Sequence, residues 1–419
     1  MQRELNNDAT AVEPRAIERE QLDDVLDGLR SFIRAEVVPL QRALGGGSDR
    51  RRIYEESGRF TPEVLNAYRH VREASAEAGY YTMLTPESIG GSGLGFEALF
   101  RVWELIYNEC GSEYWLGYQA VSHWVRGPSH LFEQASPTVR ESILPPLLDG
   151  SASACFAMSE PDAGSDVWMM RTRAVRVDGG WQRSGTKQWL SNGPYADYAY
   201  VFAVTNRELL ASHRGGVTAF IVPTTTPGFE IDSIIEMFGH QGGDEAIISL
   251  SDVFVPDTHV IGEVDMGLPL AMSGVSYGRL YNTARSVGLA QWALDKALAY
   301  AEQRITFGRP IVENQGVSFP LADSAMEIHA ARLVGMDCAR LLDEGHEGQR
   351  ELSMAKTYAT EMAVRVVDRA MQVHGGMGFT NEVGLAEVWQ QVRRICIADG
   401  SSEILRRQIV KHLRRAIPR

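Results

Sequence analysis

The amino-acid sequence predicts a mainly α-helical protein with a β-domain, a barrel or sandwich, in the middle of the chain. Helical apolar periodicity fills the first part of the chain, and short β-rich runs with turn signals follow it. Long apolar-periodic segments then return with short connections, which is typical of a helical bundle. We therefore divide the 419 residues into a disordered lead-in at 1–16, a helical domain at 17–152, a β-domain at 153–262 and a helical bundle domain at 263–419.

Start and stop signals mark the elements of the N-terminal helical domain. Four apolar residues recur at near-helical spacing: Val25, Leu29, Phe32 and Val37. Because proline disrupts a helix interior, we expect Pro39 to end this helix. Thr61-Pro62-Glu63 predicts another helix start, since proline suits the first helical position. The glycine-rich segment at 90–95 does not fit G-x-G-x-x-G and follows no strand, so we expect a tight connection there.

Turn and periodicity signals also define the other two domains. Asp178-Gly179 separates two strand-like runs, which is the pattern of a β-hairpin. Further short β-rich runs continue to about residue 262. In the bundle, a long helix is predicted from residues that share one face, namely Ala290, Leu294, Ala297 and Ala301. Long apolar-periodic segments at 320–343 and 350–374 predict two more helices.

The charge and composition of the chain exclude some classes of protein. The formal net charge of −13 argues against a nucleic-acid binder, because such binding draws on Lys and Arg. No apolar run is long enough to span a bilayer, and the polar N-terminus lacks the apolar core of a secretory signal. We therefore expect a cytoplasmic protein with no membrane partner. The four cysteines, Cys110, Cys155, Cys338 and Cys396, are far apart, so we expect reduced core residues and no metal site.

Six motifs carry a resemblance to a known family: FAMSEPDAGSD at 156–166, WQRSGTKQWLSNG at 181–193, RITFGRPI at 304–311, NQGVSFPLAD at 314–323, QVHGGMGFT at 372–380 and ADGSSEILRR at 398–407. In this order they make nearly the whole chain resemble the acyl-CoA dehydrogenase family. The resemblance implies a helical N-terminal domain, a middle β-barrel domain and a C-terminal four-helix bundle. It also implies bound FAD, an acyl-CoA substrate, an electron-transferring flavoprotein as acceptor, and a homotetramer built as a dimer of dimers.

The resemblance places the flavin ring against the first two motifs. Phe156, Met158 and Ser159 match the segment that bonds the pyrimidine edge, where donors stabilise the charge of the reduced flavin. Trp189 would pack on the dimethylbenzene side, and Ser191 would reach the N5 region. Without the other motifs, the first segment would be interpreted as a plain turn and Trp189 as a core residue.

The remaining motifs would hold the rest of FAD across a subunit interface. The matching residues are Arg304, Phe307, Gln315, Gln372, Gly375, Gly376, Ser401 and Glu403. Arginine suits a diphosphate because its guanidinium donates hydrogen bonds in pairs, and glycine lets the backbone approach a ligand closely. If the resemblance holds, the cofactor is shared between subunits and a monomer loses it.

Four residues match positions near the acyl-CoA substrate: Ser165, Arg279, Ala398 and Gly400. Ser165 would approach the pantetheine or the pyrophosphate of CoA. Arg279 would either contact the CoA end or hold the site together. Gly400 would leave room for the thioester beside the flavin.

Asp399 is the candidate catalytic base. In the family, a carboxylate removes the pro-R α-proton of the acyl thioester while the β-hydrogen leaves as a hydride to flavin N5. Most members carry Glu where Asp399 stands, and a minority carry Glu just before the arginine matched by Arg279, where this chain has Gly278. The alternative interpretation is that Asp399 only caps the following helix, a role that Ser401 or Ser402 could also fill.

Departures from the family pattern suggest an unusual substrate shape. Asp399 is one methylene shorter than Glu, so its carboxylate would sit roughly 1–1.5 Å further back. Ala398 stands where well-known members have Tyr, and together with Gly278 it is expected to enlarge the cavity. We therefore expect an acyl group that is branched or cyclic near the thioester. Gln390-Gln391 replace the commoner Arg-Asp, for which the sequence offers no firm explanation.

Three rival functions share this fold. Nitroalkane oxidases resemble the same family and use Asp at the position of Asp399, with O₂ as oxidant and no CoA. A flavin monooxygenase acting on amines or aromatics is a related alternative. A non-catalytic flavoprotein that binds nucleic acid is the third, and the acidic balance and the retained carboxylate both argue against it.

Overall fold

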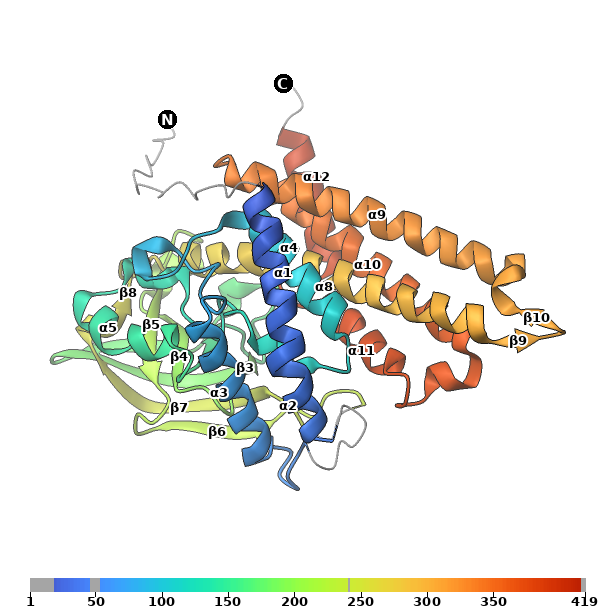
Figure 1. Cartoon of the computed structure of the whole chain (residues 1–419). Helices are drawn as coiled ribbons and strands as arrows, with labels where there is room; N and C mark the ends of the chain where they lie inside the picture. The colour runs from blue at the N-terminus through green and yellow to red at the C-terminus, as the bar shows by residue number, and fades with distance from the viewer. Residues whose placement is uncertain (1–18, 46–52, 240–241, 416–419) are drawn as a thin grey trace.

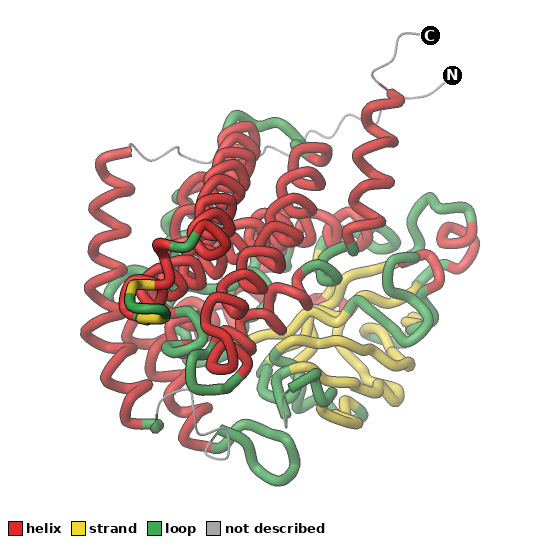
Figure 2. Tube along the Cα trace, turned by 90° about the vertical axis from the view of Figure 1, so that its right-hand side faces the viewer, coloured by secondary structure: helices red, strands yellow, loops and turns green. Residues whose placement is uncertain are grey.

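The described residues, 19–45, 53–239 and 242–415 of a computed structural model, follow the predicted order of helices, sheet and helices (Figure 1). The predicted lead-in at 1–16 lies outside the described residues. The helical parts lie beside the sheet rather than around it, as the turned view shows (Figure 2). The predicted fold class, helical N- and C-terminal parts with a middle sheet domain, is confirmed. The exact domain boundaries stay predictions.

The helices of the first part are α1 (Arg19–Phe32), α2 (Val38–Ala43), α3 (Pro62–Glu77), α4 (Gly95–Cys110), α5 (Pro137–Ser142) and α6 (Leu144–Leu148). Of these, α1 and α3 lie in front of the bundle and the sheet in Figure 1, and α4 runs behind α1. The expected helix start at Thr61-Pro62 is confirmed, because α3 begins at Pro62.

The expectation that Pro39 ends the first helix is wrong. A π-helical turn, Ile33–Val37, joins α1 to α2, and Pro39 lies in the first turn of α2. The Val38 N–H donates to the Ile33 carbonyl, five residues back instead of four. The π-turn changes which backbone carbonyl groups face Pro39. The chain therefore remains helical past the proline, to Ala43.

The middle part is one mixed sheet, with helix α7 (Arg207–Ala211) in a connection. Its strands are β1 (Ala154–Ala157), β2 (Arg173–Val177), β3 (Gly180–Ser191), β4 (Tyr198–Val204), β5 (Val217–Pro223), β6 (Phe229–Ile234), β7 (Glu245–Pro256) and β8 (Val260–Ile261). The order is β6-β7-β3-β2-β4-β5-β8, and β1 pairs with β4 in parallel. The predicted hairpin at Asp178-Gly179 is confirmed, because Val177 pairs with Gly180.

Long helices form the last part, and they lie along one another in Figure 1. They are α8 (Gly267–Gln303), α9 (Gln315–Asp343), α10 (Gln349–His374), α11 (Leu385–Ile395) and α12 (Ser402–Arg415). The alanine-rich face predicted around Ala290 and Ala297 is buried in the core. A small hairpin, β9 (Ile305–Thr306) and β10 (Arg309–Pro310), joins α8 to α9 at the end furthest from the sheet (Figure 1).

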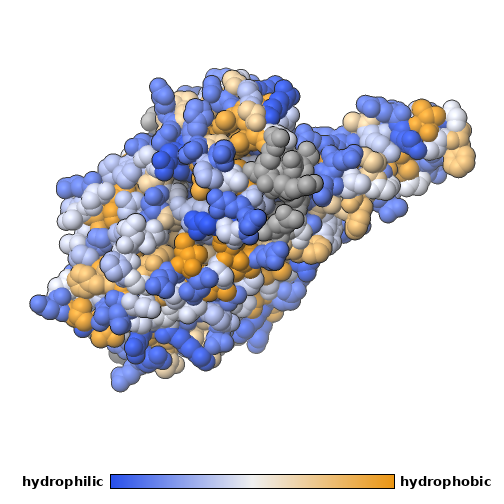
Figure 3. Space-filling view, turned by 90° about the horizontal axis from the view of Figure 1, so that it is seen from below, coloured by the Kyte–Doolittle hydropathy of each residue, from blue (hydrophilic) through white to orange (hydrophobic). Residues whose placement is uncertain are grey.

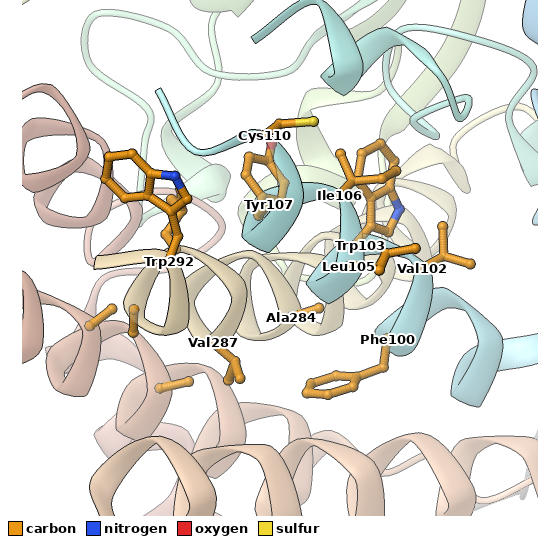
Figure 4. Close-up of a cluster of buried hydrophobic side chains, with 14 of the residues drawn as sticks. Phe100, Val102, Trp103, Leu105, Ile106, Tyr107, Cys110, Ala284, Val287 and Trp292 are labelled. Carbon is orange, nitrogen blue, oxygen red and sulfur yellow. The ribbon is translucent and has the colours of Figure 1, made fainter. Parts of the chain in front are cut away.

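One continuous apolar core joins the N-terminal helices to the bundle, so these two parts of the chain pack as one unit. Figure 4 shows the part of this core where Phe100 and Trp103 of α4 lie near Ala284 and Val287 of α8. Phe100 is fully buried, and a Cβ on Gly335 of α9 would overlap its ring. The glycine therefore lets α9 approach α4 closely.

Phe100→Ala is expected to lower the free energy of unfolding by about 3–5 kcal/mol, because a large buried ring leaves a cavity in this core. Denaturant unfolding of the purified protein measures the change. Val175→Ala is the control: Val175 lies exposed on β2, and its truncation should change stability by less than about 0.5 kcal/mol. Equal effects of the two substitutions would contradict this account of the core.

Candidate active site

The Asp399-Gly400 turn has an unusual backbone. Asp399 has φ 52° and Gly400 has φ 100°, so two successive residues lie in the left-handed region between α11 and α12. Asp tolerates this region better than most residues, and Gly adopts it at little cost. A Cβ at Gly400 would also lie 3.2 Å from Leu405 Cδ2. Such strained backbone is found mostly where function requires it, which favours a functional turn.

The carboxylate of Asp399 faces inward, onto helix α8. Asn282 Nδ2 donates to Asp399 Oδ2 at 2.7 Å. A Cβ on Gly278 would overlap the carboxylate and lie 2.9 Å from Asp399 Cγ. Gly278 is therefore the residue that lets the acid pack against the helix backbone. The expectation that Gly278 enlarges the substrate cavity is corrected here, because the carboxylate itself fills that space.

Two buried cations hold the turn through its carbonyl groups. Arg279 Nε donates to the Asp399 carbonyl at 3.2 Å, and Lys356 Nζ donates to the Gly400 carbonyl at 2.7 Å. Arg279 also donates from Nη1 to Gln349 Oε1 at 3.2 Å. Of the two roles expected for Arg279, this geometry supports the one that holds the site together.

The electrostatics of the turn favour a basic carboxylate. Burial raises the pKa of Asp399 above its ordinary value, although Lys356, Arg279 and Asn282 each act in the opposite direction. Desolvation also lowers the pKa of Lys356 to about 8, with Asp399 opposing that shift. The effect of burial on the pKa of Asp399 therefore outweighs the effect of the two nearby positive charges. A raised pKa makes the carboxylate a stronger base.

Capping of α12 does not need Asp399. The helix begins at Ser402, and Ser401 stands at its N-cap position, where its hydroxyl accepts from the Ile404 N–H at 3.4 Å. The Ser401 carbonyl also accepts from the Leu405 N–H at 3.0 Å. Ser401 thus fills the capping role, and the Asp399 side chain is free for another one.

The segment Phe156–Ser159 is anchored at the end of β1 by a buried ion pair. Lys187 Nζ lies 2.8 Å from Glu160 Oε1 and donates to the Met158 carbonyl at 3.0 Å. The Glu160 carboxylate accepts from the backbone N–H groups of Arg171 and Thr172. A buried pair with its remaining hydrogen bonds satisfied fixes local geometry, so this turn is rigid. Phe156 itself packs against Trp124, with ring centroids 4.9 Å apart.

Trp189 and Ser191 lie on β3. Trp189 stands at a bulge in the pairing with β7, and Ser191 pairs with Glu245. Trp189 has φ 65° and is 53% exposed, which is rare for a bulky residue in a strand. The Ser191 hydroxyl donates to Glu245 Oε1 at 2.8 Å. An open indole beside a hydroxyl on a rigid sheet fits one face of a flat ring system.

The residues expected to hold the adenosine end lie apart from Asp399, at the far end of the bundle. Arg304 and Phe307 lie on the β9–β10 hairpin, and Gln315 begins α9. Gln372 lies in the last turn of α10, which ends at His374, and Gly375 and Gly376 follow it, where an added Cβ would meet nothing within 4 Å. All are exposed, and Phe307 is completely so. In Figure 3 this end projects from the body and carries apolar side chains at its tip.

Three other predicted residues are exposed at the surface. Ser165 lies in the loop before a short 3₁₀ turn, Ala398 lies beside the candidate base, and Glu403 is in the first turn of α12. The carboxylate of Glu403 has a lowered pKa because it accepts hydrogen bonds at this helix start. Ala398 therefore leaves the turn open on the side away from Gly278.

Sequence reasoning missed three residues of the site: Asn282, Lys356 and Glu245. Asn282 lies one turn after Gly278 and is buried, and a buried polar residue in a long helix was the available signal. Lys356 is fully buried in α10, where lysine is rarely found. Gln391, which the sequence alone does not explain, accepts from Arg285 Nη2 at 3.1 Å.

The described part of the chain contains no cluster of three His, Cys, Asp or Glu side chains that could hold a metal ion. Within the same residues, no helix has the length and apolar content that crossing a bilayer requires. The four cysteines are free, and three of them are buried.

Comparisons with known proteins agree with this geometry. Three family models match in order: acyl-CoA dehydrogenase N-terminal domain at 19–151, middle domain at 155–253 and C-terminal domain at 265–414. A probable acyl-CoA dehydrogenase, YngJ, of Bacillus subtilis is 36% identical over 80% of this chain and 87% of its own. Human mitochondrial short-chain specific acyl-CoA dehydrogenase is 34% identical over 81% of each chain. The crystal structure of a putative acyl-CoA dehydrogenase from Mycobacterium smegmatis has a TM-score of 0.83, at 26% identity, over 96% of this chain and 99% of that one.

Asp399→Asn is expected to stabilise the folded protein at pH 7. An acid whose pKa is raised by folding favours the folded state only at low pH, and this contribution is lost as pH rises through the folded pKa. The amide carries no buried charge, so the variant should have the higher unfolding midpoint at pH 7. Thermal unfolding at pH 7 and near pH 4 measures the difference, which should shrink at the lower pH. A variant less stable than wild type at pH 7 would show that the carboxylate is not desolvated.

Proposed function

Because the chain belongs to the acyl-CoA dehydrogenase family, we propose that it oxidises an acyl-CoA thioester to the 2-enoyl-CoA with Asp399 as the base. FAD is the cofactor of this family, and when bound it supplies the acceptor for the β-hydrogen and its electron pair. The single observation that carries the proposal is the Asp399 carboxylate, packed against Gly278 on a turn with left-handed backbone.

The residues present fit that cofactor. Trp189 offers an exposed ring face, and the rigid Phe156–Ser159 segment lies where the N-terminal helices, β1 and α8 come together. At the far end, Arg304 and the open backbone of Gly375 and Gly376 offer a charge-assisted donor and close backbone approach. These two groups of residues would hold the ring and the diphosphate end respectively.

Asp399 would accept the α-proton of the thioester. Asn282 bonds Oδ2, and no hydrogen bond engages Oδ1 within the described residues, so Oδ1 is available for the proton. The proton leaves the α-carbon, and its electron pair forms the new α,β double bond as the β-hydrogen departs as hydride. The raised pKa of Asp399 makes it a stronger base than an exposed aspartate.

The backbone N–H of Asp399 would polarise the thioester carbonyl. No acceptor bonds this N–H within the part of the chain that the structure describes. A free N–H beside the base would stabilise negative charge as it develops on the carbonyl oxygen. The left-handed turn, held by Arg279 and Lys356, fixes the direction of that N–H.

The acyl group is proposed to be compact and branched or cyclic near the thioester. Asp399 has a short side chain that lies back against α8, and Ala398 beside it is small and exposed. Both features leave space around the α- and β-carbons, on the side of the turn away from Gly278. A flexible straight chain would not need that space.

A homotetramer, built as a dimer of dimers, is part of the same proposal, with FAD shared across one interface. The residues for the adenosine end project away from Asp399, on a tip that exposes Phe307 and Phe379. An exposed apolar tip of this kind is typical of a surface that another subunit covers. An electron-transferring flavoprotein is the proposed electron acceptor, and the cytoplasm, testable by cell fractionation, is the proposed location.

Arg304→Gln is expected to weaken FAD retention at least about tenfold, since it removes a charged donor to a diphosphate. Flavin absorbance per subunit after gel filtration measures the loss, and light scattering reports the assembly. Arg340→Gln, a surface arginine of α9 paired with Asp337 and Glu344, is the matched control. Full FAD content in a monomeric protein would contradict the shared site.

Anaerobic titration of the holoenzyme with acyl-CoA thioesters tests the function. Bleaching of the flavin is expected with branched or cyclic acyl-CoAs, at higher kcat/KM than with straight C4–C8 chains. Asp399→Asn should keep FAD and lose bleaching by at least about 10³-fold, because the amide cannot accept the α-proton.

Two outcomes of that titration would overturn the proposal. Normal flavin bleaching in Asp399→Asn would show that Asp399 is not the base. Bleaching by a nitroalkane, with rapid peroxide formation in air and no response to acyl-CoA, would instead establish the oxidase alternative. A clear preference for straight-chain acyl-CoAs would contradict only the proposal that the acyl group is branched or cyclic.

A further inference from the structure

A cavity of about 360 Å³ lies where the first helical part meets the middle sheet. Helix α3, the turn between β3 and β4, and strand β6 contribute to its walls, and α3 and β6 lie beside each other in Figure 1. None of the residues predicted to contact FAD or acyl-CoA lines it. Ligand sites are typically concave, often lie at junctions between domains and measure about 300–1,000 Å³, so this cavity has the size of a small-molecule site.

Three arginines line this cavity, together with a single carboxylate. The arginines are Arg59, Arg69 and Arg72, and the acid is Asp197. None of the three arginines forms an ion pair within the part of the chain that the structure describes. The Asp197 carboxylate has another partner, because its Oδ2 accepts from the Ser153 N–H at 2.8 Å. Three positive charges against one negative charge leave the cavity with an excess of two positive charges.

Arg72 offers two open hydrogen-bond donors from a partly buried position. Its Nε donates to the Gly150 carbonyl at 2.9 Å, which fixes the guanidinium group. Nη1 and Nη2 have no partner among the described residues, and both remain accessible to solvent. Burial lowers the pKa of Arg72, the charge of Arg69 acts in the same direction, and Asp197 opposes both. An anion that reaches Nη1 and Nη2 therefore meets a cation that is poorly hydrated and not yet paired.

Arg59 is also held in place before any ligand arrives. Its Nη2 donates to the Pro194 carbonyl at 2.7 Å, and its guanidinium carbon lies 5.2 Å from the centroid of the Tyr195 ring. Groups that are already positioned lose little conformational entropy when a ligand binds. Arg69 differs, because it is exposed on α3 and its side chain has no hydrogen-bond partner in the described chain. It is free to turn toward an anion that the other two hold.

Apolar side chains also line the cavity. They are Leu65 of α3 and Phe229 and Ile231 of β6, which is an edge strand of the sheet. An inorganic anion bound to the arginines would leave this apolar surface in contact with water. An organic anion would cover the surface with its apolar part, which is favourable because apolar area is removed from water.

We propose that this cavity binds an organic phosphate monoester, with the phosphate held by Arg59, Arg69 and Arg72 and the apolar part packed on Phe229 and Ile231. Guanidinium groups suit phosphate because they donate hydrogen bonds in pairs to its oxygens. A phosphate monoester carries about −1.5 to −2 charges at pH 7, which matches the excess positive charge better than one carboxylate does. The inference does not depend on the proposed dehydrogenation, since no residue assigned to that reaction lines the cavity.

Calorimetric titration of the FAD-loaded protein with phenyl phosphate, in phosphate-free buffer, tests the site. One phenyl phosphate should bind per subunit, with a Kd below about 1 mM. Benzoate has the same ring and a single charge, and inorganic phosphate lacks the apolar part, so each should bind at least about tenfold more weakly. Saturating CoA should leave the binding of phenyl phosphate unchanged, because none of the residues predicted to contact CoA lines the cavity.

Substitution of the arginines locates the bound probe. Arg69→Gln and Arg72→Gln should each weaken the binding of phenyl phosphate at least about tenfold, since each removes a charged donor. Arg69→Gln keeps the test decisive if Arg72→Gln disturbs the fold, because the Arg69 side chain makes no hydrogen bond within the described residues. Arg207→Gln is the matched control: Arg207 is an exposed arginine of α7 that does not line the cavity, and its loss should leave the binding unchanged.

Four results would overturn the inference. The first is the absence of phenyl phosphate binding up to about 10 mM. The second is binding of benzoate or inorganic phosphate as tight as that of phenyl phosphate. The third is full binding by both folded arginine variants, and the fourth is displacement by CoA, since the probe would then occupy another site. Each result leaves the proposed function standing, because flavin bleaching by acyl-CoA is measured separately.

Discussion

The packing of the Asp399 carboxylate against Gly278 is the constraint on which the rest of the site depends. The acid can lie there only because residue 278 has no side chain, and because the turn adopts left-handed backbone at two successive residues. Arg279 and Lys356 hold that turn through its carbonyl groups, not through the carboxylate, so the acid keeps its basicity. Burial then raises the pKa of the acid in spite of both cations. The backbone geometry and the electrostatics of the turn both support Asp399 as the proposed proton acceptor.

The same helix, α8, makes room for the base and for a neighbouring aromatic ring. Gly278 accommodates the Asp399 carboxylate, and Gly274, one turn earlier, accommodates the ring of Trp124. The opposite side of the helix packs into the core that joins α4, α9 and α10. The proposed base is therefore placed by a long, largely buried helix, and a site built on a helix is held more precisely than one built on a loop. The exposed tip of the bundle, by contrast, is the surface that we propose a partner subunit covers.

Much of the fold could be predicted from the sequence, because the signals for its elements are local. Periodicity located α8 and α10, and Asp178-Gly179 located the hairpin. The D-G-S-S turn made Asp399 the candidate base, which stays a prediction. The π-turn before Pro39 was not predictable, since proline usually ends a helix and only the carbonyl register shows why this one continues. The partners of Asp399 were not predicted either. Asn282 is 117 residues away in the sequence and contacts Asp399 only because the turn packs against α8. From the sequence, Gly278 was interpreted as a position that cannot supply a base and that enlarges the cavity. In the structure it provides the space into which the Asp399 carboxylate packs.

The central claim is that the Asp399 carboxylate, as placed by α8, accepts the proton. The pH dependence of flavin reduction in wild type and in Asn282→Ala tests it most directly. Asn282 donates to the charged carboxylate and so lowers the pKa of Asp399; its removal must raise that pKa. The rate should fall on the acid side in both proteins, with the fall moved to higher pH in the variant. An acid limb at the same pH in both proteins would contradict the account.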